Sequence, residues 1–309
     1  MHIPVMLAEV MDALALKSGD TVVDCTLGGG GYTKAMAEVV GSDGQVIAID
    51  ADEEAIKNLE FRIKNLLPNN IVLVHDNFRN LKEILKTHEL QKVDGVVFDL
   101  GLSSDQLRDA SRGFSFALDA PLVMEMGELR NKQSATYTIV NITDRVALEN
   151  IIRTYGEERY AGRIARAITA HRPLQTTKQL AAVITNAVPA GYEHGRLHPA
   201  TRTFQALRIA TNDELNSLRE GLAAAVDVLQ PGGRVVVVSF HSLEDRIVKQ
   251  LFKRESSGCV CPAAVPVCVC EHVPQLRVIT KKIVTPTAAE VAGNPRSRSA
   301  KLRAAEKIS

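Results

Sequence analysis

The chain has 309 residues, which is enough for one large domain or for two domains with separate cores. Its apolar fraction of 45% and charged fraction of 24% are typical of a globular protein. No apolar run is long enough to cross a bilayer, which excludes a membrane-spanning helix. The first residues do not form a basic segment followed by an apolar one, so we expect no secretory signal and a cytoplasmic protein.

The net charge of +1 conceals an uneven distribution. Residues 1–130 carry 12 Lys and Arg against 21 Asp and Glu, whereas residues 131–271 carry 17 against 13 and residues 272–309 carry 8 against 2. A polyanionic partner would therefore bind the second half of the chain more readily than the first. Charge alone equally permits a solvated surface without such a partner.

Strand and helix patterns alternate through the first hundred residues. After an opening helix over Val5–Leu16, the apolar runs predict strands at Thr21–Cys25, Gln45–Asp50, Ile71–His75 and Gly95–Leu100. Between these strands, apolar residues at helical spacing predict helices over Tyr32–Val40, Asp52–Leu67 and Phe78–His88. This alternation predicts an α/β fold with a parallel sheet that helices cover on both faces.

The pattern becomes helical from about residue 105 to 200, with helices expected over Ala147–Thr154 and Ala161–Ala170. A long helix over Thr203–Leu229 and a strongly apolar strand over Arg234–Phe240 then restore the α/β pattern. The tail beyond residue 255 reads as irregular. We therefore predict one discontinuous domain, residues 1–105 and 205–309, interrupted by an inserted helical domain, residues 106–204, that recognises the substrate.

A glycine run joins the first predicted strand to the helix that follows it. Gly28–Gly31 begin four residues after Asp24, and the second strand ends in Asp50, which is the layout of a nucleoside-binding βαβ unit. The third glycine of the dinucleotide fingerprint is absent, because Thr33 or Lys34 stands at its position. An acidic residue followed by Gly-x-Gly instead resembles S-adenosylmethionine (SAM) methyltransferases. A structural turn without a ligand, or a nicotinamide-dependent oxidoreductase, is the alternative.

The fourth predicted strand ends in Asp99, and Ser103 and Ser104 follow. The carboxyl ends of the strands in such sheets face the ligand, so we expect these side chains beside the cofactor. Hydrogen bonds from a carboxylate or hydroxyl can localise the lone pair of an exocyclic amine and direct it at a methyl donor. We therefore predict that Asp99, Ser103 and Ser104 are catalytic. An Asp in this position also commonly serves only as a turn or cap residue.

Seven segments together resemble the bacterial 16S rRNA (cytosine-N4)-methyltransferase family, known as MraW. They occur in order over essentially the whole chain, at His2–Val5, Asp99–Leu107, Arg112–Phe116, Tyr155–Arg159, His198–Arg208, Ser239–Arg246 and Asn294–Ser299. The resemblance implies a Rossmann-like SAM-dependent methyltransferase sheet. It also implies methylation of the N4 amine of a cytidine in 16S rRNA of the small ribosomal subunit, with SAM as cofactor.

The resemblance also implies where the cofactor binds. Its contacts carry over to Gly30, Gly31, Tyr32, Asp50, Phe78, Asp99 and Gln106. Two departures from the family pattern stand out. Tyr32 replaces the usual His, and the loop Asp119–Gly127 has lost two acidic residues and carries Glu125 where the family has Arg. We expect this loop to bear on substrate positioning or on catalytic rate.

Several basic and polar residues in the second half suit an RNA substrate. We predict that Arg202, Arg208, Asn212 and His241 bind the substrate, since Arg contacts phosphates and polar side chains read a splayed-out base. The Asn and the His are equally compatible with caps or packing. Arg163, Arg166 and Arg172 lie near the end of a predicted helix of the insertion. A binding protein that holds rRNA without turnover is the alternative from another class, and a homodimer is left open.

Two Cys-x-Cys pairs, Cys259 with Cys261 and Cys268 with Cys270, stand in the tail. Four thiolates can form a tetrahedral zinc site. The spacing differs from the usual Cys-x-x-Cys, so ordinary thiols in a loop are the favoured interpretation and no metal is predicted.

Overall fold

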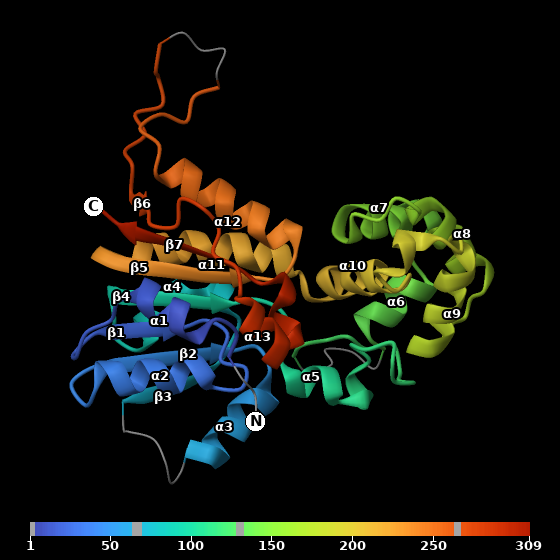
Figure 1. Ribbon diagram of the computed structural model, residues 1–309, viewed down its shortest axis with the longest axis horizontal. Helices are drawn as coiled ribbons and strands as arrows, with labels where there is room; N and C mark the ends of the chain where they lie inside the picture. The colour runs from blue at the N-terminus through green and yellow to red at the C-terminus, as the bar shows by residue number, and fades with distance from the viewer. Residues whose placement is uncertain (1–3, 64–69, 128–132, 263–266) are drawn as a thin grey trace. The chain divides into compact units, whose positions relative to one another are not determined.

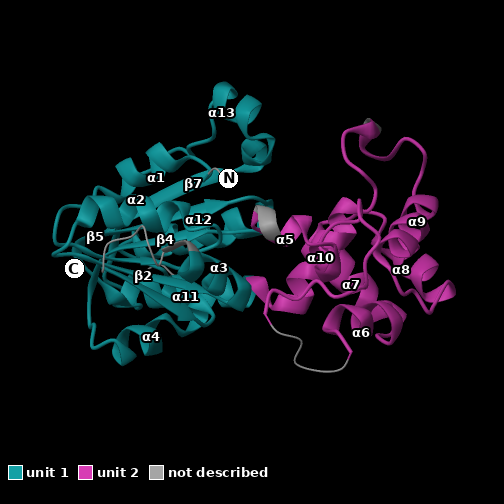
Figure 2. Cartoon of the chain, turned by 90° about the horizontal axis from the view of Figure 1, so that it is seen from below, with its two compact units in different colours: residues 1–101, 215–309 teal, residues 102–214 magenta. Residues whose placement is uncertain are grey.

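The computed structural model describes residues 4–63, 70–127, 133–262 and 267–309, without the side chains of residues 62, 63, 104, 105 and 194. His2 and Ile3 of the first family segment lie outside this range. The chain forms two compact units (Figure 2): the sheet unit, residues 1–101 and 215–309, and the helical unit, residues 102–214. The predicted domain boundaries, at 105/106 and 204/205, stay a prediction. No helix in the described part of the chain is long and apolar enough to cross a membrane.

A seven-stranded sheet forms the centre of the sheet unit (Figure 1). Its strands are β1 (Thr21–Asp24), β2 (Gln45–Asp50), β3 (Ile71–His75), β4 (Val93–Asp99), β5 (Leu229–Ser239), β6 (Leu276–Val278) and β7 (Lys301–Lys307). The order is β3-β2-β1-β4-β5-β7-β6, and the pairs among the first five are parallel. The predicted Rossmann-like sheet is thereby confirmed. The order reverses between β1 and β4, which is where such sheets bind ligands.

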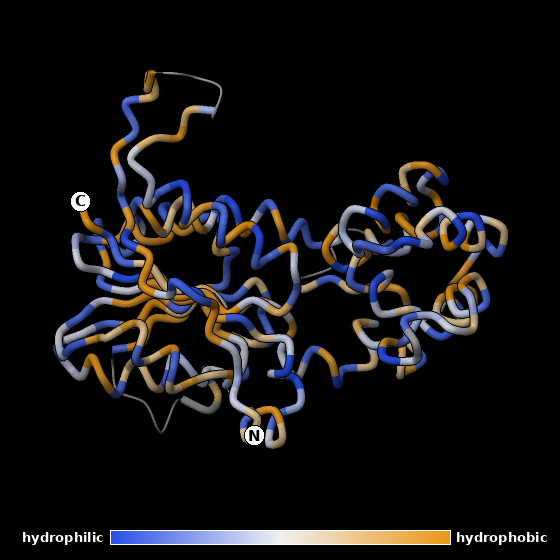
Figure 3. Tube along the Cα trace, turned by 45° about the horizontal axis from the view of Figure 1, so that its top comes forward, coloured by the Kyte–Doolittle hydropathy of each residue, from blue (hydrophilic) through white to orange (hydrophobic). Residues whose placement is uncertain are grey.

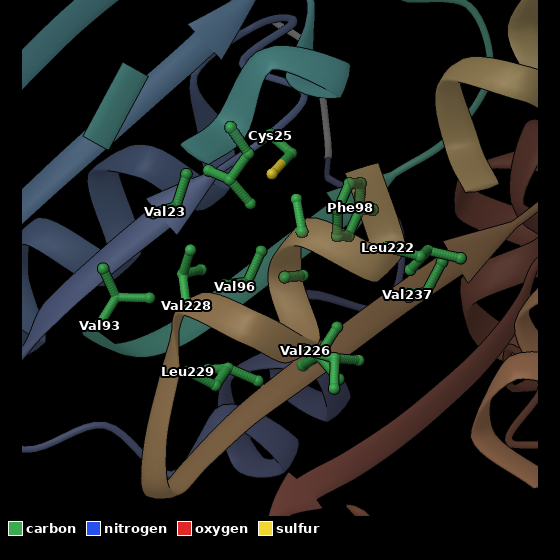
Figure 4. Close-up of a cluster of buried hydrophobic side chains, with 14 of the residues drawn as sticks. Val23, Cys25, Val93, Val96, Phe98, Leu222, Val226, Val228, Leu229 and Val237 are labelled. Atoms are coloured by element: carbon green, nitrogen blue, oxygen red, sulfur yellow. The ribbon is translucent and has the colours of Figure 1, made fainter. Parts of the chain in front are cut away.

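Side chains that alternate along the strands build two separate cores. Val23, Val96 and Val237 point to one face, where α4 (Leu81–Thr87), α11 (Glu214–Val228) and α12 (Ser242–Glu255) pack (Figure 4). Val22, Val97 and Val236 point to the other face, against α1 (Leu7–Leu14) and α2 (Gly31–Val40). Because both faces are buried, the central positions of β1, β2, β4 and β5 are apolar. Figure 3 shows hydrophobic stretches running through this unit. The helix α3 (Glu53–Ile63) follows β2.

The prediction of an irregular tail is wrong. It contains β6, the helix α13 (Ala288–Gly293) and β7, which pairs antiparallel with β5. Charged residues hide the strand pattern of β7, but the fold gives them partners. The Arg303 guanidinium binds the Asp245 carboxylate at 2.7 Å, and Glu306 binds Arg234 at 3.2 Å.

The predicted single helix over Thr203–Leu229 is also wrong. The chain forms α10 (Thr201–Asn212) and α11, separated at Asp213, which has a left-handed φ of 51°. Asp tolerates this conformation better than most residues with a side chain, so one residue ends one helix and admits the next. Each helix has its own stripe of buried apolar residues, and in the sequence the two stripes follow one another with only Asp213 between the helices. The pattern therefore resembles that of one long helix.

The helical unit has a core of its own. Its helices are α5 (Ser104–Arg108), α6 (Ala135–Asn141), α7 (Arg145–Gly156), α8 (Ala161–Ala170), α9 (Thr177–Ala187) and α10. Leu148, Ile152, Ile164, Leu180 and Leu207 are buried together between them. The described residues of this unit contain no strand beyond one isolated bridge, so its helical character is as predicted.

Candidate cofactor site

The glycine turn between β1 and α2 is shaped by close packing. Gly28 and Gly30 have left-handed φ values of 49° and 76°, which glycine adopts at little cost. A Cβ on Gly30 would lie 2.6 Å from the Leu59 side chain, and one on Gly31 would lie 2.1 Å from the Pro4 ring. The Leu59 and Pro4 side chains therefore occupy the space that side chains on Gly30 and Gly31 would need. The turn leads into the start of α2, where N–H groups have no partner within the helix.

Asp24 fixes this turn from below. It is fully buried, and its two carboxylate oxygens accept hydrogen bonds from the Thr33 hydroxyl at 2.6 Å and from the Thr26 N–H at 3.2 Å. Burial raises its pKa to about 6. With both oxygens engaged inside the protein, Asp24 is a structural residue of the turn.

Asp50 stands at the end of β2 and is held by two backbone groups. One carboxylate oxygen accepts the Gly28 N–H at 2.9 Å, and the other accepts the Asp52 N–H at 2.9 Å. Burial raises its pKa to about 6. Each oxygen has a second lone pair, so the fixed carboxylate can still accept two hydroxyl groups.

Asp99 ends the neighbouring strand β4 and has an unsatisfied side chain. Its backbone N–H donates to the Thr26 hydroxyl at 2.6 Å. Its Oδ1 is buried, yet has no hydrogen-bond partner among the described residues. Burial, and then the charges of Asp24 and Glu244, hold its pKa well above the usual range. A buried acceptor without a partner costs free energy, so it marks a place where a ligand donor fits.

Two aromatic residues border this edge of the sheet. Tyr32, in the first turn of α2, is 3% exposed and donates its hydroxyl to the Val5 carbonyl. Phe78 begins the short helix η1 (Phe78–Asn80) and packs edge-on against Phe98, with ring centroids 5.4 Å apart. The Tyr32 hydroxyl is therefore already engaged, and the Phe78 ring is anchored on the sheet core.

His241 occupies the N-cap position of α12. Its ring Nε2 lies 3.0 Å from the buried Glu244 carboxylate, while its Nδ1 accepts the Glu244 N–H at 3.4 Å. The Glu244 carboxylate accepts the His241 N–H at 3.2 Å in return, and it also accepts the Phe240 N–H at 2.8 Å. The histidine thus has the capping role that its sequence position left open.

In the helical unit, Ser103 and Gln106 cap α5 reciprocally. The Ser103 N–H donates to Gln106 Oε1 at 2.9 Å, and the Gln106 N–H donates to the Ser103 hydroxyl at 3.1 Å. The Ser104 side chain lies outside the described residues. The structure thus gives both described side chains a local role.

The predicted substrate residues of α10 are also engaged. Arg208 forms a two-pronged ion pair with Glu214 at 2.7 and 2.8 Å. Arg202 contacts Glu193 at 3.3 Å and is about a third exposed. Asn212 donates to the carbonyls of Met124 and Arg208 and accepts the Met126 N–H at 2.8 Å.

The unusual loop Asp119–Gly127 is held firmly by these and other contacts. Arg112 donates to the Glu125 and Met126 carbonyls at 3.0 and 2.6 Å, and Met124 is buried. The Glu125 carboxylate accepts the N–H of Ala135, the first residue of α6, at 2.7 Å. The residue that replaces the family's Arg thus has a structural partner.

The predicted cations on α8 divide into two kinds. Arg172, just past the helix, donates to the Val140 and Thr143 carbonyls at 2.7 Å each, which makes it structural. Arg163 and Arg166 are exposed, and Arg163 lies 5.9 Å from the centre of the Tyr160 ring.

Three residues around the site were not singled out from the sequence. Thr26 and Thr33 hold Asp99 and Asp24, and Glu244 anchors His241. The two threonines stand two residues before and two residues after the glycine run, so their place in the motif was the available signal. Glu244 follows His241 at capping-box spacing.

Comparisons with known proteins agree over the full length. The MraW methylase family matches residues 1–308. Proteins named ribosomal RNA small subunit methyltransferase H are similar to this chain. The one from Dehalococcoides mccartyi is 51% identical over 99% of this chain and 86% of its own length. The one from Geotalea uraniireducens is 51% identical over 99% and 98%, and that from Thermomicrobium roseum 48% identical over 99% and 94%.

Solved structures align more loosely. A structure titled as a putative rRNA-methylase from Clostridium thermocellum aligns over 100% of this chain and 99% of its own, with 16% identity and a TM-score of 0.46. The assignment therefore rests on the sequence matches, which cover nearly every residue at about half identity. The chain belongs to the MraW methylase family.

Proposed function

We propose that the protein transfers a methyl group from SAM to the N4 amine of a cytidine in 16S rRNA of the small ribosomal subunit. The observation that carries the proposal is the buried Oδ1 of Asp99, which has no hydrogen-bond partner among the described residues and lies beside the glycine turn. Membership of a methylase family, and relatives named for small-subunit ribosomal RNA, supply the class of reaction and of substrate.

The sheet unit offers the groups that SAM needs. The glycine turn leads into the start of α2, whose N-terminal N–H groups suit the carboxylate at the amino-acid end of the cofactor. The Asp50 carboxylate, fixed by two N–H donors, accepts the two ribose hydroxyls. Phe78 borders the adenine, and Tyr32 lines the methionine end. When bound, SAM supplies an electrophilic methyl group on a sulfonium.

In our proposal Asp99 orients the nucleophile. Its free oxygen accepts a hydrogen bond from the exocyclic amine, which localises the nitrogen lone pair toward the methyl group. The ionised carboxylate does this best, because a protonated one donates through its hydroxyl and accepts only as a neutral, weaker acceptor. A sulfonium nearby favours ionisation by its positive charge. The amine loses its proton to water after methyl transfer. Roles for Ser103, Ser104 and Gln106 stay predictions.

The RNA contacts in this proposal come from basic residues whose side chains are at least partly exposed. We propose that Arg163, Arg166 and the partly exposed Arg202 contact phosphates. Arg208 and Asn212, whose polar atoms are engaged, would shape the substrate surface. So would His241, whose buried Nε2 lies 3.0 Å from the Glu244 carboxylate but has no hydrogen-bond partner among the described residues. Small-subunit rRNA as substrate implies the predicted cytoplasmic location, and a homodimer stays an open prediction.

Incubation with methyl-labelled SAM and small ribosomal subunits from a strain that lacks the modification tests the proposal. We expect N4-methylcytidine in the digested 16S rRNA, identified by mass spectrometry. If the protein binds SAM and subunits but transfers no methyl group, the rRNA-binding alternative is correct. Reduction of a substrate by a nicotinamide cofactor would instead support the oxidoreductase alternative.

Asp50→Ala tests the cofactor site separately. Loss of two hydrogen bonds to a charged acceptor, about 1.5 kcal/mol each, should weaken SAM binding about 100-fold, measured by calorimetry. Asp43→Ala, in a turn before β2, is the matched control and should bind SAM like the wild type. Unchanged affinity of Asp50→Ala would remove Asp50 from the ribose site.

A further inference from the structure

The segment between α12 and β6 lacks a hydrophobic core. Within the sheet unit, it follows Glu255, the last residue of α12, and ends before Leu276, the first residue of β6 (Figure 1). None of its described residues between Ser256 and Gln275 is buried, and Val267 and Val269 are 71% and 74% exposed. At its base, the Gln275 N–H donates to the Glu255 carbonyl at 2.8 Å. Apolar burial therefore cannot order the outer part of this segment.

Sulfur atoms are what the outer part brings together. The Sγ atoms of Cys259, Cys261, Cys268 and Cys270 all lie within 4.8 Å of one another. Cys268 Sγ is 3.6 Å from Cys270 Sγ, which is 3.9 Å from Cys259 Sγ. All four cysteines are free thiols. The two Cys-x-Cys pairs thus place their four sulfur atoms around one point.

Backbone N–H groups are aimed at the same sulfurs. The Val260 N–H donates to Cys270 Sγ, the Cys261 N–H to Cys259 Sγ and the Val269 N–H to Cys261 Sγ, each at 3.4 Å. Two of these bonds cross from one Cys-x-Cys arm to the other. Such donors stabilise negative charge on sulfur and orient it, as the surroundings of metal ligands do.

We propose that these four cysteines bind one structural Zn²⁺ ion. Four sulfurs placed tetrahedrally at a Zn–S distance of about 2.3 Å lie about 3.8 Å apart, which matches the separations of 3.6 and 3.9 Å. Four protein ligands leave no open position for water or substrate, so the ion would cross-link the two ends of the segment and take no part in methyl transfer. Each Cys-x-Cys pair would supply two of the four ligands.

Metal content of the full-length protein tests the proposal. Purified without chelator, it should hold about one zinc per chain by elemental analysis, and Cys268→Ser/Cys270→Ser should hold less than about a tenth of that. Cys25→Ala is the matched control, because Cys25 is the one cysteine outside the cluster, and it should keep its zinc. Cobalt in place of zinc should give the visible absorption of a tetrahedral tetrathiolate.

Proteolysis gives a readout that does not depend on metal analysis. Exposed Glu271 follows Cys270 directly, so a glutamate-specific protease should cut there many times faster after chelation, and zinc should restore protection. A folded, reduced protein that takes up no equimolar zinc, or one that holds iron or a disulfide instead, would overturn the proposal. The test does not involve methyl transfer, so its failure leaves the proposed function unaffected.

Discussion

Asp99 at the end of β4 and two residues of α10, Arg208 and Asn212, were all predicted to be functional, but their side chains differ in whether their polar atoms have hydrogen-bond partners. Arg208 and Asn212 on α10 have partners for their side chains within the helical unit. Asp99 at the end of β4 has a buried oxygen without one among the described residues. A satisfied polar group stabilises the fold, whereas an unsatisfied one costs stability and is retained for binding. The two regions should therefore respond to mutation in opposite ways.

Asp99→Asn should separate activity from stability most clearly. We expect methyl transfer to fall about 10³-fold, since a neutral amide oxygen is a weaker hydrogen-bond acceptor than the carboxylate that orients the amine. The free energy of unfolding should stay the same or rise by about 1 kcal/mol, because a buried carboxylate is costly and a neutral amide is less so. Single-turnover rates and urea denaturation measure the two effects. A less stable variant that keeps full activity would make Asp99 a structural residue.

Asp24, a strand-end carboxylate whose oxygens both have partners, should make the free energy of unfolding depend on pH. Its pKa of about 6 in the fold lies above the ordinary value of 3.8, so the folded state holds this proton more tightly than the unfolded state. Its contribution to stability is therefore present below pH 4 and is lost as the pH rises to 6, by about 3 kcal/mol. Asp24→Asn should remove this part of the pH dependence in urea denaturation between pH 4 and 7. Equal slopes in both proteins would contradict the raised pKa.

Asn212→Ala tests the satisfied side of the comparison. The substitution removes three hydrogen bonds and frees the loop around Met124 and Met126, which should lower the free energy of unfolding by about 2 kcal/mol. Asn150→Ala, at an exposed position on α7, is the control and should change it by less than about 0.5 kcal/mol. If Asn212→Ala is as stable as the control but loses rRNA methylation, Asn212 contacts the substrate directly.

Much of the sheet unit was predictable because its chemistry is local. Continuous apolar runs gave β1 to β4, and the strand ends placed Asp50 and Asp99 at one edge of the sheet. Strand β7 was not predictable, since its charged side chains are explained only by distant partners such as Asp245. Likewise, no local pattern indicates that Asn212 holds the backbone near Met124. Contacts between distant segments decide whether a polar residue is structural or available.

Glu125→Ala probes the smallest effect, in the loop that departs from the family pattern. Glu125 accepts the N–H of Ala135 at the start of α6, where a negative charge is also favourable. Its removal should cost about 0.7 kcal/mol of unfolding free energy, and Glu125→Gln, which keeps the acceptor, should recover roughly half. Methylation should change less than about twofold in both variants, because the other contacts keep the loop in place. A large loss of activity at unchanged stability would show instead that Glu125 itself acts on the substrate.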